Sequence, residues 1–188
     1  MRYFRPAIFA VLLGFVALPA AALELCDELW FTRNLIFDRA GYCFGSALGQ
    51  VVFDNAGCTS GAPNLSPQAQ QLVEYIRSEE VDWSCAVNSD GQRLAVDFQA
   101  IRMAITDIPI PSGFVSSCFG WRGPGLALRA AHDVTAAQTG MVEKGDDIIW
   151  EFERVDGWSF IISSRGNGAM GWMQEPQMDE QSCDAFGG

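Results

Sequence analysis

Hydrophobic side chains in the first part of the chain recur at the spacing of an α-helix. Leu25, Leu29 and Ile36, with Thr32 between them, follow one another at steps of four, three and four residues. Residues three or four positions apart share one face of a helix. The pattern therefore predicts an amphipathic helix over residues 25–38.

Glycines mark the end of this helix and interrupt the segment after it. Gly41 follows the periodic residues, and glycine readily adopts the left-handed conformation that ends many helices. Gly45 and Gly49 lie in the next stretch, and glycine is a poor helix former. We expect residues 42–53 to form loop and short extended structure.

Two further helices are predicted between residues 66 and 105. Ser66 followed by Pro67 is a typical helix start, because serine caps free N–H groups and proline fits the first helical position. The apolar face of this helix consists of Leu72, Val73, Tyr75 and Ile76. The other predicted helix is short. It rests on apolar residues at helical spacing, which are Leu94, Phe98, Ile101 and Ile105.

The pattern becomes strand-like in the second half of the chain. Short runs rich in β-branched and aromatic residues alternate there with glycine-rich turns. The predicted strands are residues 127–129, 140–146, 148–154, 158–162 and 171–173. Several short strands separated by such turns indicate a small barrel or sandwich. Because the pattern changes near residue 90, we favour two domains.

The N-terminus has the pattern of an export signal. Arg2 and Arg5 precede an apolar run over residues 7–18, which is too short to span a bilayer, and Ala20–Ala22 offers small residues for cleavage. We therefore expect cleavage near Ala22 and a periplasmic or secreted protein. No later segment is long and apolar enough for a membrane span.

Charge narrows the range of partners. The whole chain carries a formal net charge of −11. Removing the signal takes away two arginines and leaves 23 acidic residues against ten basic ones, a charge of −13. Such a surface repels phosphate backbones and anionic lipid headgroups, so we expect no nucleic acid partner.

Six cysteines follow the signal, and an exported chain forms disulfides. Their spacings are too long for a Cys-x-x-Cys redox pair or for a typical zinc site, so we expect structural bonds and no metal. The two-domain division favours the pair Cys118–Cys183 and leaves four cysteines in the first half, for which we prefer Cys26–Cys85 and Cys43–Cys58. The sequence alone leaves other pairings open.

Polar residues on and after the first helix form a candidate binding cluster. Arg33 falls within the apolar face, followed by Asn34 and, six residues after Arg33, by Arg39. One interpretation is that these side chains bind a ligand. The other is that they tie the helix to the following loop through hydrogen bonds to backbone carbonyls, each contributing roughly 1.5–3 kcal/mol.

Residues 29–44 resemble the YARHG domain, a small exported bacterial module named for a Tyr-Ala-Arg-His-Gly run. Arg33-Asn34, Arg39 and Gly41 stand in matching places. The chain departs from the family name at Phe37, Asp38 and Ala40, and so lacks the motif histidine. The whole chain resembles the DUF4453 family, which joins such a module to a second domain.

The second half resembles the bacterial SH3-like domain over residues 114–174. The resemblance rests on Leu128-Arg129, Lys144-Gly145-Asp146, Gly157-Trp158 and Gly171-Trp172, in that order. It implies a small barrel that binds cell-wall peptides or proteins. Ala130-Ala131-His132 replaces the usual Ser-Gly-Pro, which changes the first loop.

The resemblance makes exposed tryptophans the natural ligand contacts, since aromatic rings offer large contact areas. We take Trp121 and Trp150 as candidate binding residues and Trp158 and Trp172 as core residues.

These observations predict an α+β fold: a small disulfide-braced, mainly helical N-terminal domain followed by an SH3-like β-barrel. The expected organisation is a signal peptide at 1–22, a YARHG-like helical domain at 23–88, a connector with a short helix at 89–113, and the barrel at 114–188.

Catalytic signatures are absent from the sequence. His132 is the only histidine, it lies in a polar turn where we expect surface exposure, and no nucleophile elbow or phosphate loop is present. We expect a non-catalytic binding protein of the cell envelope, without a cofactor, whose partner is peptidoglycan or a protein. The alternatives are a carboxylate-based cell-wall or glycan hydrolase and a secreted inhibitor of a hydrolase.

Overall fold

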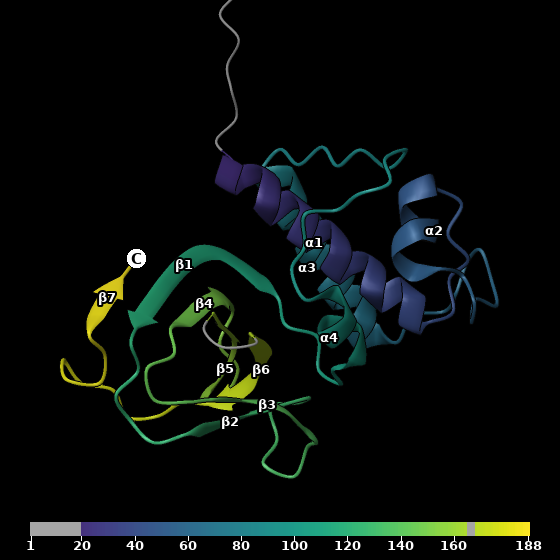
Figure 1. Cartoon of the computed structure of the whole chain (residues 1–188). Helices are drawn as coiled ribbons and strands as arrows, with labels where there is room; N and C mark the ends of the chain where they lie inside the picture. Colours follow the sequence, from purple (N-terminus) through teal and green to yellow (C-terminus); the bar gives the residue numbers. More distant parts are fainter. Residues whose placement is uncertain (1–19, 165–167) are drawn as a thin grey trace, which may run out of the picture.

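The computed structural model describes residues 20–164 and 168–188, so the expected signal peptide lies outside the described part except for residues 20–22. The described chain is an α+β fold with helices on one side and an antiparallel sheet on the other (Figure 1). The helices are α1 (Ala20–Arg39), α2 (Ala47–Phe53), α3 (Pro67–Asp82) and α4 (Gln99–Ala104). The strands are β1 (Pro111–Phe119), β2 (Leu126–Arg129), β3 (Gln138–Val142), β4 (Ile148–Phe152), β5 (Trp158–Ser163), β6 (Ala169–Gln174) and β7 (Ala185–Gly187).

Helix α1 contains the predicted segment 25–38 and ends as expected. Gly41 follows it with φ +81°, and a side chain there would lie 2.5 Å from the Thr59 hydroxyl. Only glycine fits both the left-handed backbone and this close approach. Leu29 and Ile36 on α1 pack with the buried residues Val73 and Ile76 of α3.

Helix α2 corrects the expectation of loop structure over residues 42–53. Ser46 caps the helix by accepting a hydrogen bond from the Gly49 N–H at 3.1 Å. Gly49 is buried against the Phe44 ring, where a Cβ atom would lie within 2.7 Å. Its small size therefore serves close packing, and the glycine does not break the helix.

Helix α3 begins at the predicted Ser66-Pro67 pair. The Ser66 hydroxyl accepts a hydrogen bond from the Ala69 N–H at 3.2 Å, and Pro67 is the first helical residue. The predicted short helix is α4, which begins only after Phe98.

Within the described residues the sheet has seven strands in the order β3-β2-β6-β5-β4-β1-β7. All of its pairings are antiparallel, and they leave β3 and β7 as edges, so the sheet is not closed. The five strands that the pattern predicted correspond to β2 to β6. Strands β1 and β7 are additional; β1 is the curved strand that faces the helices in Figure 1.

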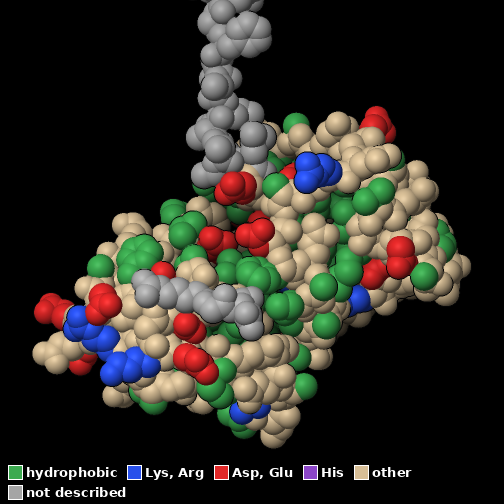
Figure 2. Space-filling model, viewed as in Figure 1, with side chains coloured by type: hydrophobic (Ala, Val, Ile, Leu, Met, Phe, Trp, Pro, Cys, Tyr) green, Lys and Arg blue, Asp and Glu red, His purple; other side chains and the backbone are tan. Residues whose placement is uncertain are grey.

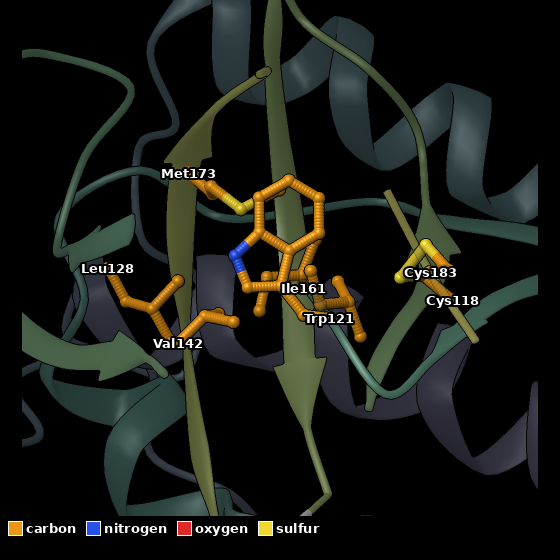
Figure 3. Packing of buried hydrophobic residues seen from close by; sticks show 8 residues of the cluster. Cys118, Trp121, Leu128, Val142, Ile161, Met173 and Cys183 are labelled. Atoms are coloured by element: carbon orange, nitrogen blue, oxygen red, sulfur yellow. A yellow bond between two sulfur atoms is a disulfide. The ribbon is translucent and has the colours of Figure 1, made fainter. Parts of the chain in front are cut away.

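Trp121 lies at the centre of one sheet core (Figure 3). Its side chain is only 2% exposed and packs among buried residues of the six strands β1 to β6. A second core joins the sheet to the end of α4: Ile105, the residue after that helix, packs with Phe160 and Trp172. Trp172 and Trp158 are both buried.

A buried arginine connects the helices to the sheet. Arg102 of α4 is fully buried and forms an ion pair with Glu28 of α1 and a 2.8 Å hydrogen bond to the Thr32 hydroxyl. Its guanidinium carbon lies 4.6 Å from the centre of the Phe31 ring and 5.3 Å from that of Phe152 on β4. Helix α1, helix α4 and the sheet therefore share one charged contact.

Three disulfides join the six cysteines, all of which lie in the described ranges: Cys26–Cys85, Cys43–Cys58 and Cys118–Cys183. These are the three pairs expected from the sequence. No helix among the described residues is both long and apolar enough to cross a membrane.

Candidate functional site

The three polar residues proposed on the first helix all have partners within the protein. Arg33 forms an ion pair with Glu80 of α3 at 3.0 Å. The buried Asn34 amide donates to the Trp30 carbonyl at 2.8 Å. Arg39 donates to the carbonyls of Thr106, at 2.9 Å, and of Ile105. The structure thus does not bring them together as one polar site.

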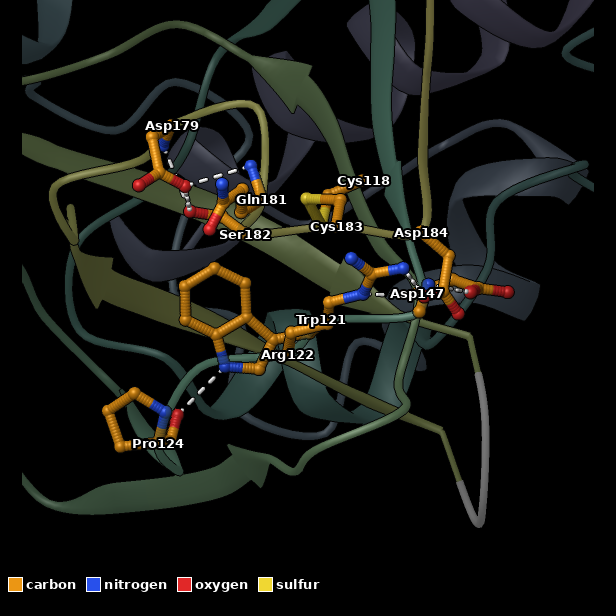
Figure 4. Close-up of a disulfide and its surroundings, with 11 residues drawn as sticks. Cys118, Trp121, Arg122, Pro124, Asp147, Asp179, Gln181, Ser182, Cys183 and Asp184 are labelled. Atoms are coloured by element: carbon orange, nitrogen blue, oxygen red, sulfur yellow. Dashed lines mark hydrogen bonds and ion pairs between the residues drawn. A yellow bond between two sulfur atoms is a disulfide. The ribbon is translucent and has the colours of Figure 1, made fainter.

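The two candidate tryptophans have different environments. Trp121 is buried, and its indole N–H donates to the Pro124 carbonyl at 2.8 Å (Figure 4). Trp150 on β4 is half-buried: it packs against the sheet core and also lines a surface groove. Of the two, only Trp150 reaches a surface where a ligand could contact it.

The groove owes its shape to a bulge in β1. This strand leaves its register with β4 between residues 111 and 116. The Ser112 hydroxyl bridges the bulge, lying 3.2 Å from the Phe114 N–H and 3.1 Å from the Glu151 carbonyl. Gly113 has φ +76°, and a side chain there would meet the Trp83 ring at 2.9 Å. Bulges redirect side chains, and here Phe114 is left 78% exposed.

Strand β7 supplies the other wall of the groove. It pairs with the second half of β1, from Ser117 onward. The Cys118–Cys183 disulfide and the ion pair between Arg122 and Asp184 hold the preceding segment in place (Figure 4). Phe186 of β7 is 54% exposed.

The resulting groove, of about 880 Å³, is lined mainly by apolar side chains. Those that define its surface are Phe114, Val115, Trp150, Met173, Met178 and Phe186. Figure 2 shows one face of the molecule, on which hydrophobic side chains gather where the sheet meets the helices, with acidic side chains among them.

The carboxylates beside the groove are engaged by neighbouring side chains. Glu153 accepts a 2.5 Å hydrogen bond from the Tyr75 hydroxyl, and this bond raises the pKa of Tyr75. Glu175 accepts from the Ser159 hydroxyl at 2.6 Å and pairs with Arg154. The groove therefore offers an incoming molecule mainly apolar contacts.

His132 is less exposed than the sequence suggested. Its side chain is 38% exposed, and Nδ1 lies 2.7 Å from the Asp107 carboxylate. Its ring also packs edge-on against Trp172, with the ring centres 5.2 Å apart. Among residues 20–164 and 168–188, no group of three or more His, Cys, Asp or Glu side chains could hold a metal ion.

The sequence pattern did not identify Phe114 and Phe186 as groove residues. Neither belongs to a motif, and each lies in a strand that the pattern did not predict. A search for aromatic residues near glycine and proline at strand ends would have included both.

Two protein families match different parts of the chain. The YARHG domain family matches residues 7–80. The family described as "Domain of unknown function (DUF4453)" matches residues 84–188, more than half of the chain, so the protein belongs to this family. Searches of curated proteins and of solved structures find no match.

Proposed function

We propose that this protein is a non-catalytic, exported binding protein of the cell envelope, and that its groove holds an extended peptide segment of a protein partner. One observation carries the proposal. Phe114 and Phe186 project from neighbouring strands into a single groove while remaining more than half exposed. Contiguous exposed apolar surface of this kind marks interaction sites.

Two features favour a peptide over a glycan. Sugar hydroxyls need free polar side chains, but the carboxylates of Glu153 and Glu175 are already hydrogen-bonded within the protein. The bulged part of β1 lies beyond the end of its pairing with β7. Beyond that pairing an extended peptide can lie along β1, while its apolar side chains fill the groove.

We further propose that the sheet is SH3-like. The family-like turn Lys144-Gly145-Asp146 leads into β4, Gly157-Trp158 begins β5, and Gly171-Trp172 lies within β6. SH3 domains bind extended peptides in aromatic-lined grooves. The open sheet with its β7 edge is a variation on that plan.

Export is part of the proposal, with periplasmic or secreted location after cleavage near Ala22. Three disulfides support it, because such bonds persist in oxidising compartments. A low-charge peptide suits this apolar groove, and the acidic surface disfavours nucleic acid.

Retention on two immobilised materials tests the function: purified peptidoglycan sacculi and envelope proteins extracted in mild detergent. The variant F114S/F186S removes the aromatic walls. The control V51S removes an apolar side chain that is 56% exposed on α2, far from the sheet (Figure 1). The wild type and V51S should retain the same envelope protein, and F114S/F186S should lose it.

Two results would oppose the proposal. Equal retention of the envelope protein by F114S/F186S and V51S would show that the groove takes no part in binding. Retention on sacculi alone, unaffected by F114S/F186S, would make the protein a glycan binder that uses another surface.

A further inference from the structure

A second cavity, of about 870 Å³, lies where the two family regions meet. The end of α1 and the start of α3 form one side of it, and residues 106–108 with His132 form the other. Its apolar walls include Ile36, Leu65, Leu72 and Ile108. Ligand sites are frequent at such junctions, where apolar walls surround a few polar groups. We call this cavity the junction cleft.

His132 is held in one orientation at the cleft. The Asp107 carboxylate oxygen Oδ2 lies 2.7 Å from Nδ1 and also accepts the His132 backbone N–H at 3.2 Å. Trp172 donates from its indole N–H to the Asp107 carbonyl at 2.9 Å, which fixes this segment. Nε2 of His132 has no hydrogen-bond partner among the described residues, so it is free to serve a ligand.

Arg39 brings a positive charge to the same cleft. It uses two of its five N–H groups on the carbonyls of Ile105 and Thr106, which leaves three N–H groups for a ligand. Partial burial lowers the pKa of Arg39, although Asp38 and Asp107 oppose that effect. Arg39 forms no ion pair with any residue that the structure describes, whereas Arg33, Arg102, Arg122 and Arg154 each pair with a carboxylate.

We propose that the junction cleft binds a small ligand with a terminal carboxylate and a short aliphatic body. The guanidinium of Arg39 receives the carboxylate, because a planar fork of N–H donors matches two carboxylate oxygens. Nε2 of His132 bonds a second polar group of the ligand. Leu65, Leu72 and Ile108 contact the aliphatic part.

This chemistry has two sources: a free aliphatic carboxylic acid, or the carboxyl end of a peptide. The site is separate from the groove, so its occupancy does not depend on the function proposed above.

The single histidine of the chain provides a direct probe. In the mature, oxidised protein, the ¹H–¹³C signal of the imidazole Cε1 group belongs to His132 alone. Three probes are added separately: isovalerate, a tripeptide ending in leucine with a free carboxyl group, and the same tripeptide as its C-terminal amide.

At least one carboxylate probe should shift the signal along a saturating curve, with a dissociation constant of about 1 mM or lower. The amide should not shift it. Isovalerate alone would identify a free acid as the source, and the tripeptide alone would identify a peptide end. The proposal fails if neither carboxylate shifts the signal at about 10 mM, or if the amide binds equally well.

Arg39→Gln adds a second test. It should weaken binding about 10-fold to 100-fold, the value of hydrogen bonds to a charged group. Arg77→Gln, at an exposed arginine on α3, should leave the affinity unchanged, and equal weakening by both would refute the role of Arg39. If Arg39→Gln does not fold, the comparison of the carboxylate and amide probes on the wild type still tests whether the cleft recognises a carboxylate.

Discussion

Removal of the Glu28 charge tests how Arg102 holds the helices to the sheet. Arg102 is fully buried, and its ion-pair partner among the described residues is Glu28, whose side chain is 17% exposed. Burial raises the pKa of Glu28, and the charge of Arg102 opposes that rise. The variant Glu28→Gln keeps the shape of the side chain and leaves the guanidinium without its counter-charge.

The expected cost is about 3 kcal/mol of unfolding free energy. Breaking a buried ion pair by removing one partner costs roughly 3–5 kcal/mol, because a charge stays buried without compensation. The lower end applies here, since Glu28 is partly exposed and Glu151 also attracts Arg102. For a chain of this size the melting temperature should fall by about 6–12 °C.

The double variant Glu28→Gln/Arg102→Met completes the cycle. A methionine fits between the Phe31 and Phe152 rings that now flank the guanidinium, and replacing a buried ion pair with apolar groups is often neutral. The double variant should therefore unfold within about 1 kcal/mol of the wild type.

Urea unfolding of the mature, oxidised protein at pH 7, followed by tryptophan fluorescence, measures the wild type, the single variants Glu28→Gln and Arg102→Met, and the double variant. A double variant that loses the sum of the two single losses would show that the pair is not coupled. It would then refute the role given to this contact.

Three further predictions concern single side chains. Burial, together with neighbouring carboxylates, raises the pKa of Glu151, so the stability that this group contributes is complete below its unfolded pKa and is lost as pH rises through the folded value. Glu151→Gln should therefore unfold at a higher urea concentration than the wild type at pH 7, and its stability should fall less as pH rises. A steeper fall of stability with pH than in the wild type would contradict this reasoning. Trp121→Ala should lower the free energy of unfolding in urea by about 3–5 kcal/mol, as for other buried tryptophans. A loss below about 1 kcal/mol would show that Trp121 does not contribute to the core. Asp107 lies against Nδ1 of His132, so neutral His132 should carry its proton on Nδ1. ¹⁵N spectra should show this form in the wild type and a shift toward the Nε2–H form in Asp107→Asn. Identical spectra for the two proteins would contradict the contact.

Local signals in the sequence predicted the elements whose causes are local. The Ser66-Pro67 start of α3 depends on a cap within one turn, and the strands β2 to β6 alternate within short windows. Helix α2 was not predicted, because a glycine within a short segment suggests a helix break. Here Gly49 is required instead for close contact with Phe44, which the sequence does not show. Strand β7 has three residues, too few for a period to appear.

The candidate site was predicted only in part, for a similar reason. Arg39 and Trp150 do reach surface cavities, but different ones. Trp121 is buried in the sheet core with its indole N–H bonded to the Pro124 carbonyl, an arrangement that composition cannot reveal. Phe114 faces the groove because a bulge redirects it, and Gly113 in that bulge lies close to the ring of the distant Trp83.

Photo-crosslinking in intact cells tests the central claim, that the groove between β1 and β7 binds an envelope protein. A photoreactive amino acid replaces Phe114 in one strain and Val51, on α2, in a control strain. We predict that position 114 yields a covalent adduct with one envelope protein and that position 51 does not. The same adducts from both positions, or none from position 114, would contradict the claim.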